Sequence, residues 1–322
     1  MKRELLLLRH GKSEPAGQAG DRDRDRALTD RGKRAAQRVG VWLAQQQLVP
    51  DLVIASPAER ALVSAEKCCK TMGVRGTAVA QDERLYAADP NAMLQVLADC
   101  AGSARRVMLV GHNPGLTLLL KWLAKPPLSN PEGRKLMPTA ALAHLRTTDE
   151  WAGLTEQRAD LLHLIHASGL PKKFPFPMPD GEGRRDRPAY YYHQSSVIPY
   201  RTDNGQLQIL VIRSSQDKHW VVPKGIADPG LSLQESAGKE AWEEAGVEGE
   251  VAGEVVGSYS YRKWGATCSV AVYPMRVTRQ LPEQVWEERH RGRLWVSPKK
   301  AGELLRQPEL RPMIATLAQS LA

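Results

Sequence analysis

The hydrophobic positions in the first half of the chain form short apolar runs that alternate with longer amphipathic stretches. The runs predict β-strands, and they lie at 5–8, 51–55 and 107–110. In the stretches between and after them, apolar residues recur three and four positions apart, which predicts helices at 31–48, 58–72 and 116–123. Strands that alternate with helices indicate an α/β fold with a parallel, doubly wound sheet that carries helices on both faces.

The second half of the chain has a different pattern. Two apolar segments flank the polar sequence Thr202-Asp203-Asn204-Gly205-Gln206, which predicts a β-hairpin. A helix is expected from about Leu233 to Ala245, and the residues from Pro298 onward are also expected to be helical. The predicted strands of this half lie at 195–201, 207–213, 251–261, 267–277 and 293–296. The halves show no internal repeat, so we predict two different folds.

A proline-rich stretch separates the two patterns. Residues 171–188 read PKKFPFPMPDGEGRRDRP, and this composition without apolar periodicity predicts a semi-extended linker. We therefore expect one domain at 1–168, a linker at 169–189 and a second domain at 190–322.

The composition is that of an ordinary globular protein. The chain has 322 residues, of which 42% are hydrophobic and 25% charged, and this length suggests about two domains. The longest apolar runs fall well short of the ~20 residues of a membrane span, and the leucine run near the start is interrupted by Arg9 and His10. The four cysteines do not show the spacing of a metal-binding pair. We expect a cytoplasmic protein with no membrane partner.

The net charge of +9 suits either nucleic acid or small phosphate-rich substrates. The run Asp21–Arg26 alternates acids with arginines and is locally neutral, which predicts a solvated surface. We therefore expect a small phosphorylated substrate, and RNA binding is kept only as an alternative that a steep salt dependence of affinity would support.

Cationic and imidazole groups follow each of the first three predicted strands. The first strand ends in Arg9-His10-Gly11-Lys12-Ser13, Arg60 follows the second, and His112 follows the third. Because ligands bind at the carboxyl ends of the strands in open α/β sheets, these side chains are expected to meet at one edge. Arginine forks match phosphate oxygens, and imidazole is a competent nucleophile. The pattern therefore predicts a phosphoryl-binding pocket.

Residues 1–168, including Leu28-Thr29-Asp30-Arg31-Gly32, resemble the histidine phosphatase superfamily, and most closely its small bacterial phosphohistidine phosphatases of the SixA type. The resemblance implies that His10 is the nucleophile that becomes phosphorylated. It also implies that Arg9, Arg60 and His112 bind the transferred group, with Gly11 and Ser13 in the substrate site. No cofactor is expected here.

This half departs from the superfamily in one place. Larger members have a glutamate general acid shortly after a leucine, and here Ala87 stands in that place after Leu85. An acid is needed for poor leaving groups, so the departure restricts the site to good ones, such as phosphohistidine or a phosphoanhydride. Glu83 or Asp89 could substitute for the acid, but each is expected to be a solvated loop carboxylate.

Three glutamates mark the predicted helix of the second half. Glu240, Glu243 and Glu244 occupy positions i, i+3 and i+4 and therefore share a helix face. Their carboxylates repel one another unless a cation binds, and hard divalent ions favour such oxygen ligands. The alternative is a charged, solvated helix face.

Residues 190–322 resemble the Nudix hydrolases. Gly225, Glu240, Glu243, Glu244 and Gly246 match the family signature at the right spacing. The resemblance implies an α/β/α sandwich with a mixed sheet, and Mg²⁺ or Mn²⁺ held by the three glutamates. It also implies that Glu243 and Glu244 are catalytic, and that Lys224 and Gly225 lie at the substrate.

Two signature positions differ: Leu231 replaces a glutamate, and Lys239 replaces the arginine that pairs with it in the family. Glu235, four residues before Lys239, could supply a substitute pair. Farther along the chain, Glu287 and Glu288 are candidates for a base or a further ligand, or are surface carboxylates.

We interpret the chain as a bifunctional phosphohydrolase. The second domain would use Mg²⁺ to cleave phosphoanhydrides in nucleoside or dinucleoside polyphosphates. The first would act without metal through a phosphohistidine intermediate. The alternative is a phosphatase for a phosphohistidine protein, with a Nudix domain that senses a nucleotide and regulates it.

Overall fold

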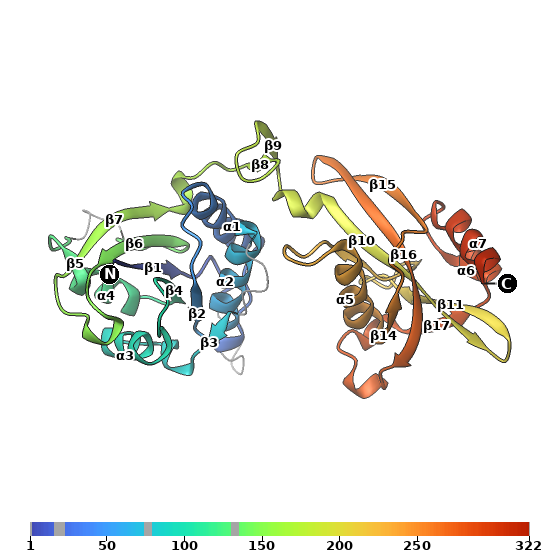
Figure 1. Cartoon of the computed structure of the whole chain (residues 1–322), viewed down its shortest axis with the longest axis horizontal. Helices are drawn as coiled ribbons and strands as arrows, with labels where there is room; N and C mark the ends of the chain where they lie inside the picture. The colour runs from blue at the N-terminus through green and yellow to red at the C-terminus, as the bar shows by residue number, and fades with distance from the viewer. Residues whose placement is uncertain (1, 16–22, 74–78, 130–134, 322) are drawn as a thin grey trace. The chain divides into compact units, whose positions relative to one another are not determined.

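The computed structural model describes residues 2–15, 23–73, 79–129 and 135–321. The chain divides into two compact units, Met1–Pro188 and Ala189–Ala322, and each is described by itself (Figure 1).

The first unit is built around a seven-stranded sheet in the order β3-β2-β4-β1-β6-β7-β5. Its helices are α1 (Asp30–Gln45), α2 (Glu59–Met72), α3 (Pro90–Cys100) and α4 (Gly115–Leu123). Its strands are β1 (Arg3–Arg9), β2 (Leu52–Ala55), β3 (Ala80–Gln81), β4 (Arg106–Gly111), β5 (Ala124–Lys125), β6 (Ala141–Thr147) and β7 (Ala159–His166), and a separate hairpin holds β8 (Phe174–Phe176) and β9 (Gly183–Arg185). Short 3₁₀ helices are η1 (Asp23–Asp25), η2 (Glu83–Leu85), η3 (Trp151–Gly153) and η4 (Ala167–Gly169).

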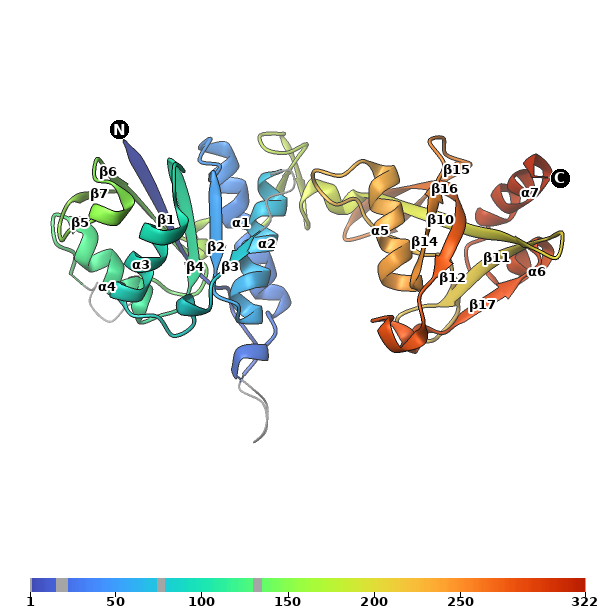
Figure 2. The same cartoon turned by 60° about the horizontal axis from the view of Figure 1, so that its bottom comes forward.

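The four leucines of β1 show how the sheet is covered on both faces. Leu5 and Leu7 pack into a core with residues of α3 and α4, whereas Leu6 and Leu8 pack into a second core with α1 and α2. Successive side chains of a strand point to opposite faces, so an unbroken leucine run fits a central strand between two helical layers (Figure 2). The predicted doubly wound α/β fold is confirmed.

The sheet is not parallel throughout, which corrects the expectation from sequence. Strands β1 to β4 pair in parallel, but β6 runs antiparallel to β1 and to β7. Only the short η3 lies among the residues between β6 and β7, and a connection without a crossover helix returns the chain antiparallel. His163 and His166 lie on the strand β7. Their short apolar segment is compatible with the period of a strand and with that of a helix.

The proline-rich stretch folds against the first unit and is not a semi-extended linker. It forms the β8–β9 hairpin, and Phe174 is only 1% exposed. Gln45 of α1 donates to the carbonyl of Pro179, and Arg187 pairs with Asp30. The prediction from composition was wrong because the stretch contains two phenylalanines, whose apolar side chains can be buried.

The second unit places one helix on one face of a mixed sheet and two helices on the other. Its main sheet has the order β12-β11-β10-β16-β14, with β13 on β10, β15 on β16 and β17 on β11. The helices are α5 (Leu233–Ala245), α6 (Pro298–Leu304) and α7 (Leu310–Ser320). The strands are β10 (His193–Asp203), β11 (Gln206–Arg213), β12 (Trp220–Val221), β13 (Lys224–Ile226), β14 (Val247–Val251), β15 (Gly257–Lys263), β16 (Ala266–Gln280) and β17 (Arg293–Val296). The 3₁₀ helices are η5 (Ala189–Tyr192), η6 (Glu283–Val285) and η7 (Arg289–Arg291).

Two separate cores hold this sandwich together. Apolar residues of α5 pack with Val197 and Leu210 on one face, and residues of α6 and α7 pack with Ile198 and Ile209 on the other. The expected α/β/α sandwich with a mixed sheet is confirmed. The three tyrosines at 190–192 lie in the 3₁₀ helix η5, and the Tyr192 hydroxyl donates to the carbonyl of Trp264.

Across the part of the chain that the structure describes, every helix is too short or too polar to cross a membrane.

Candidate active sites

The carboxyl edge of the first sheet brings together the residues predicted to bind a phosphoryl group. His10 follows β1 and His112 follows β4, and the paired register of these two strands sets them side by side. Their ring centroids are 5.1 Å apart. Arg60 lies in the first turn of α2, which follows β2. All three side chains are largely buried, so the expected convergence is present in the structure.

His10 is held in the form that a nucleophile needs. Its Nδ1 lies 2.7 Å from the carbonyl oxygen of Gly11, and because a carbonyl can only accept, Nδ1 carries the proton and donates it. The lone pair is therefore on Nε2. Burial, with further contributions from Arg60 and Arg9, lowers the pKa of His10 to about 4, so the imidazole is neutral at pH 7.

His112 and Arg9, which were also predicted to bind the phosphoryl group, are held by contacts with neighbouring segments. His112 Nε2 lies 2.8 Å from the hydroxyl of Ser56, and burial lowers the pKa of His112 to about 3. Arg9 donates through Nη1 to the carbonyl of Met137 at 2.8 Å. Among the residues that the structure describes, the buried Nε of Arg9 and the buried Nδ1 of His112 have no hydrogen-bond partner.

The loop after His10 is pinned between two helices. A Cβ on Gly11 would lie 2.6 Å from the backbone oxygen of Gly32, at the start of α1, so this close approach requires glycine. The amide of Gly11 donates to Ser64 Oγ at 2.9 Å, and Ser64 donates to the carbonyl of Arg60. One serine thus links the turn that carries Arg60 to the residue after the nucleophile.

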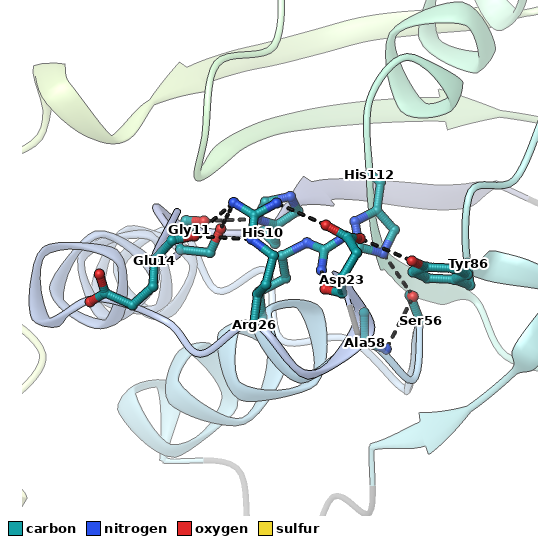
Figure 3. Close-up of polar contacts among 11 residues, drawn as sticks. His10, Gly11, Glu14, Asp23, Arg26, Ser56, Ala58, Tyr86 and His112 are labelled. Carbon is teal, nitrogen blue, oxygen red and sulfur yellow. Dashed lines mark hydrogen bonds and ion pairs between the residues drawn. The ribbon is translucent and has the colours of Figure 1, made fainter. Parts of the chain in front are cut away.

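Two charged residues of the site were missed from sequence. Asp23 and Arg26 belong to the run expected to form a solvated surface, yet Asp23 pairs with Arg60. Arg26 Nη2 lies 3.2 Å from the Oγ of Ser13, a predicted substrate-binding residue. Figure 3 shows Arg26 beside Asp23. Asp21 and Arg22 lie outside the described residues.

The sequence signal for these residues is weak, because alternating charges single out no position. The one available cue is that the run connects the Arg-His-Gly loop to α1.

The two carboxylates considered as replacements for the missing acid are engaged elsewhere. Asp89 caps α3 by accepting from the amide of Ala92, and Glu83 pairs with Arg24 at the surface. Ala87 itself adopts a left-handed backbone conformation with φ of 52°.

In the second unit, Glu240 lies against the glycine loop that precedes its helix. A Cβ on Gly225 would lie 1.7 Å from Glu240 Oε1, so glycine is required for this carboxylate to reach the loop. Burial, together with Glu244 and Glu243, raises the pKa of Glu240 to about 8. A buried carboxyl group whose like-charged neighbours disfavour its ionisation is a position where a cation would stabilise the charged form.

The other two glutamates are paired with basic groups. Glu244 accepts from the backbone amide of Lys224 at 3.0 Å and from Arg291 Nη2 at 2.7 Å, and burial raises its pKa. Glu243 Oε1 lies 3.6 Å from the ammonium of Lys239.

Among the residues with described positions, no group of three His, Cys, Asp or Glu side chains is arranged to hold a metal ion. Carboxylate oxygens are the ligands that a hard divalent cation prefers, so the three glutamates suit such an ion. In the structure, however, Glu244 is paired with Arg291 and Glu243 with Lys239.

The lysine that replaces the signature arginine has a partner in the structure. Lys239 pairs with Asp228, in the segment before α5. Glu235, the substitute partner suggested by the sequence, forms a capping box with Ser232 at the start of α5. Glu288 also has a structural partner, Arg291.

A cavity of about 700 Å³ opens beside Glu244. Its wall includes basic side chains and aromatic rings, the combination expected for a phosphate chain joined to an aromatic base. Lys224 reaches it with its ammonium 2.8 Å from both Gln194 Oε1 and the Tyr261 hydroxyl. The residues that line it include Trp220, Lys224, Tyr259 and Arg291.

Comparisons with known proteins identify a family for each unit. Residues 5–89 match the histidine phosphatase superfamily (branch 1), and residues 192–317 match the NUDIX domain. An uncharacterized protein of Mycobacterium leprae (strain TN) is 28% identical over 160 residues, which are 48% of this chain and 96% of that protein. An uncharacterized protein of Mycobacterium tuberculosis (strain ATCC 25618 / H37Rv) is 30% identical over 151 residues, or 45% of this chain and 90% of that protein.

Solved structures resemble one unit or the other. A candidate phosphohistidine phosphatase SixA from Nakamurella multipartitia has a TM-score of 0.42 and 26% identity, covering 52% of this chain and 96% of that one. The protein histidine phosphatase SixA complexed with tungstate has a TM-score of 0.43 and 17% identity, over 51% and 97%. An Ap4A hydrolase of C. elegans has a TM-score of 0.37 and 20% identity, over 40% and 97%.

Proposed function

We propose that this chain, which belongs to the histidine phosphatase superfamily in its first unit and carries a NUDIX domain in its second, is a bifunctional phosphohydrolase. The two units catalyse different reactions on small phosphorylated substrates. The observation that carries the proposal is the setting of His10, whose Nδ1–H donates to the carbonyl of Gly11 and whose ring centroid lies 5.1 Å from that of His112.

In the first unit, His10 Nε2 attacks the phosphorus of the substrate. The new N–P bond forms as the bond to the leaving group breaks, and the leaving group departs with the bonding electrons. Arg9 and Arg60 bind the phosphoryl oxygens and offset their charge. Water then hydrolyses the phosphohistidine to phosphate and free His10. With Ala87 in the acid's position, this site is expected to favour leaving groups that need no proton from the enzyme, such as the ring-protonated imidazole of phosphohistidine or a phosphate.

In the second unit, the proposed reaction is cleavage of a phosphoanhydride in a nucleoside or dinucleoside polyphosphate. Glu240, Glu243 and Glu244 would hold Mg²⁺ or Mn²⁺. When bound, the ion supplies charge neutralisation and Lewis acidity to the phosphates. Lys224 and Arg291 line the cavity and bind substrate phosphates. Trp220 and Tyr259 offer aromatic faces for a base.

A specific contact favours a second candidate function. Arg291 engages Glu244 through a 2.7 Å hydrogen bond, so the carboxylate is neutralised without a metal. In this alternative, the first unit is a phosphatase for a phosphohistidine protein, and the second binds a nucleotide and regulates it without cleaving it.

A phosphate-release screen separates the two functions. Nucleoside polyphosphates, dinucleoside polyphosphates and a phosphohistidine peptide are incubated with the full chain, in Mg²⁺ or in chelator. His10→Ala should abolish the chelator-resistant activity and leave the Mg²⁺-dependent one. Glu243→Gln combined with Glu244→Gln should do the reverse. Chelator-resistant activity that survives His10→Ala would refute the first assignment, and nucleotide binding without turnover in Mg²⁺ would favour the regulatory alternative.

A further inference from the structure

The phosphatase pocket contains one carboxylate that neither the predicted mechanism nor the resemblance uses. Asp23, in η1, contacts three residues of the site. Its Oδ2 accepts from Arg60 Nη2 at 2.7 Å and from the Tyr86 hydroxyl at 2.9 Å, and its Oδ1 accepts from Arg26 Nη1 at 2.8 Å. Figure 3 shows Asp23 between Arg26 and Tyr86, beside His112.

These contacts determine which edge of the Arg60 guanidinium remains free to bind an oxyanion. Arg60 donates through Nη2 to the Asp23 carboxylate and through Nη1 to the Asp23 backbone oxygen. One residue therefore engages both terminal nitrogens, which form the end edge of the fork. An arginine binds an oxyanion in bidentate fashion through either its end edge or its side edge. The side edge, formed by Nε and Nη2, is thus left for a phosphoryl group.

The surroundings of Arg60 explain why such a restraint is needed. Its side chain is only 8% exposed, and Arg9 and Arg26 lie close enough to affect the same imidazole as Arg60 does. Like charges at this spacing repel one another most strongly in a partly desolvated pocket. Without the Asp23 carboxylate, the guanidinium would keep the hydrogen bond from Nη1 to the Asp23 backbone oxygen but lose the one from Nη2.

Asp23 is itself anchored from independent elements. Tyr86 follows η2, and its ring packs edge-on against His112 with centroids 5.7 Å apart. Hydrogen bonds from Arg26, Tyr86 and Arg60 lower the pKa of Asp23. The carboxylate is therefore ionised and does not replace the general acid missing at Ala87.

We propose that Asp23 is a positioning residue of the phosphatase site, which holds the end edge of Arg60 so that its side edge faces the phosphoryl group. The inference rests on the proposed phosphatase function. A carboxylate that positions Arg60 acts on phosphoryl binding and on the transition state alike, and it acts equally on all leaving groups. A general acid would matter most for the poorest leaving group.

The test compares Asp23→Ala and Asp23→Asn with the matched control Asp25→Ala, an exposed acid in the same η1. Binding of tungstate and of inorganic phosphate to the full chain is measured by calorimetry. Hydrolysis of two aryl phosphates, one with a more acidic leaving phenol than the other, is measured in chelator. Asp23→Ala should weaken oxyanion binding about 10-fold, the effect of losing a charge-assisted hydrogen bond. It should lower kcat/KM by a similar factor for both esters.

Asp23→Asn and one further variant, Tyr86→Phe, guard against a folding artefact. Asp23→Asn keeps an oxygen that accepts from Arg60 and should recover part of the loss. Tyr86→Phe removes a single anchor of Asp23 and should weaken oxyanion binding only a few-fold. Asp25→Ala should match the unmodified protein.

Three results would overturn the proposal: unchanged or tighter oxyanion binding by Asp23→Ala, a loss confined to the ester with the less acidic phenol, or an equal loss in Asp25→Ala. If the unmodified chain bound neither tungstate nor phosphate, the proposed phosphatase function would fail and the role of Asp23 with it.

Discussion

Replacing Glu240 by glutamine should stabilise the second unit, and the gain should grow with pH. Glutamine has nearly the same shape as glutamate and stays neutral. In the folded chain, burial and the charges of Glu244 and Glu243 raise the pKa of Glu240 from 4.5 to about 8. In the unfolded chain the carboxyl group titrates near its ordinary value.

The sign and size of the effect follow from proton linkage. A raised carboxyl pKa leaves stability intact below about pH 4.5, removes it progressively up to about pH 8, and causes no further loss above that. Each pKa unit corresponds to about 1.4 kcal/mol, so the penalty reaches about 3 kcal/mol at pH 7 and about 5 kcal/mol above pH 8. Glu240→Gln avoids this penalty at every pH.

Urea denaturation in chelator, from pH 5 to pH 9, measures the difference. Five of the eight tryptophans lie in residues 189–322, so fluorescence reports mainly on this unit. Glu240→Gln and the unmodified chain should be close in stability at pH 5, and the variant should be more stable by several kcal/mol at pH 8.5. Mg²⁺ added at pH 8.5 should stabilise the unmodified chain and leave the variant little changed. A stability difference that stays constant from pH 5 to pH 9 would refute the reasoning.

Further predictions concern the first unit and its link to the second. Ser64→Ala leaves the buried Gly11 amide without its acceptor and should lower kcat/KM of the phosphatase about 10-fold, whereas Ser64→Thr should restore it; a kcat/KM equal to that of the unmodified chain would show that this hydrogen bond does not position His10. Because the pKa of His10 is about 4 and protonation removes its lone pair, the phosphatase kcat/KM should be flat at neutral pH and fall below about pH 4, and a fall centred near pH 6.5 would contradict the buried, neutral imidazole. If the units act in series on a polyphosphate, His10→Ala should let the nucleoside diphosphate accumulate in chromatograms of the products, and unchanged final products at an unchanged rate would exclude the series.

The sequence predicted most reliably the features that local pattern or spacing determines. The helix at Leu233–Ala245 has the bounds expected from its periodicity. The convergence of His10, Arg60 and His112 follows from parallel strands that share a carboxyl edge.

The sequence could not predict contacts between segments that are far apart along the chain. Asp23 pairs with Arg60, 37 residues farther along the chain, and Lys239 pairs with Asp228, 11 residues before it. The hairpin that contains Phe174 shows the same limit, since a proline-rich composition does not reveal that an apolar side chain has a surface to pack on.

Detection of the phosphoryl group on His10 tests the central claim most directly. The full chain is mixed with a phosphorylated substrate in chelator, quenched within milliseconds under alkaline conditions that preserve phosphohistidine, digested, and examined by mass spectrometry. The account predicts a phosphoryl group on the peptide that contains His10, which decays as phosphate is released and is absent from His10→Ala. Turnover without such a peptide, or with the phosphoryl group on another residue, would contradict it.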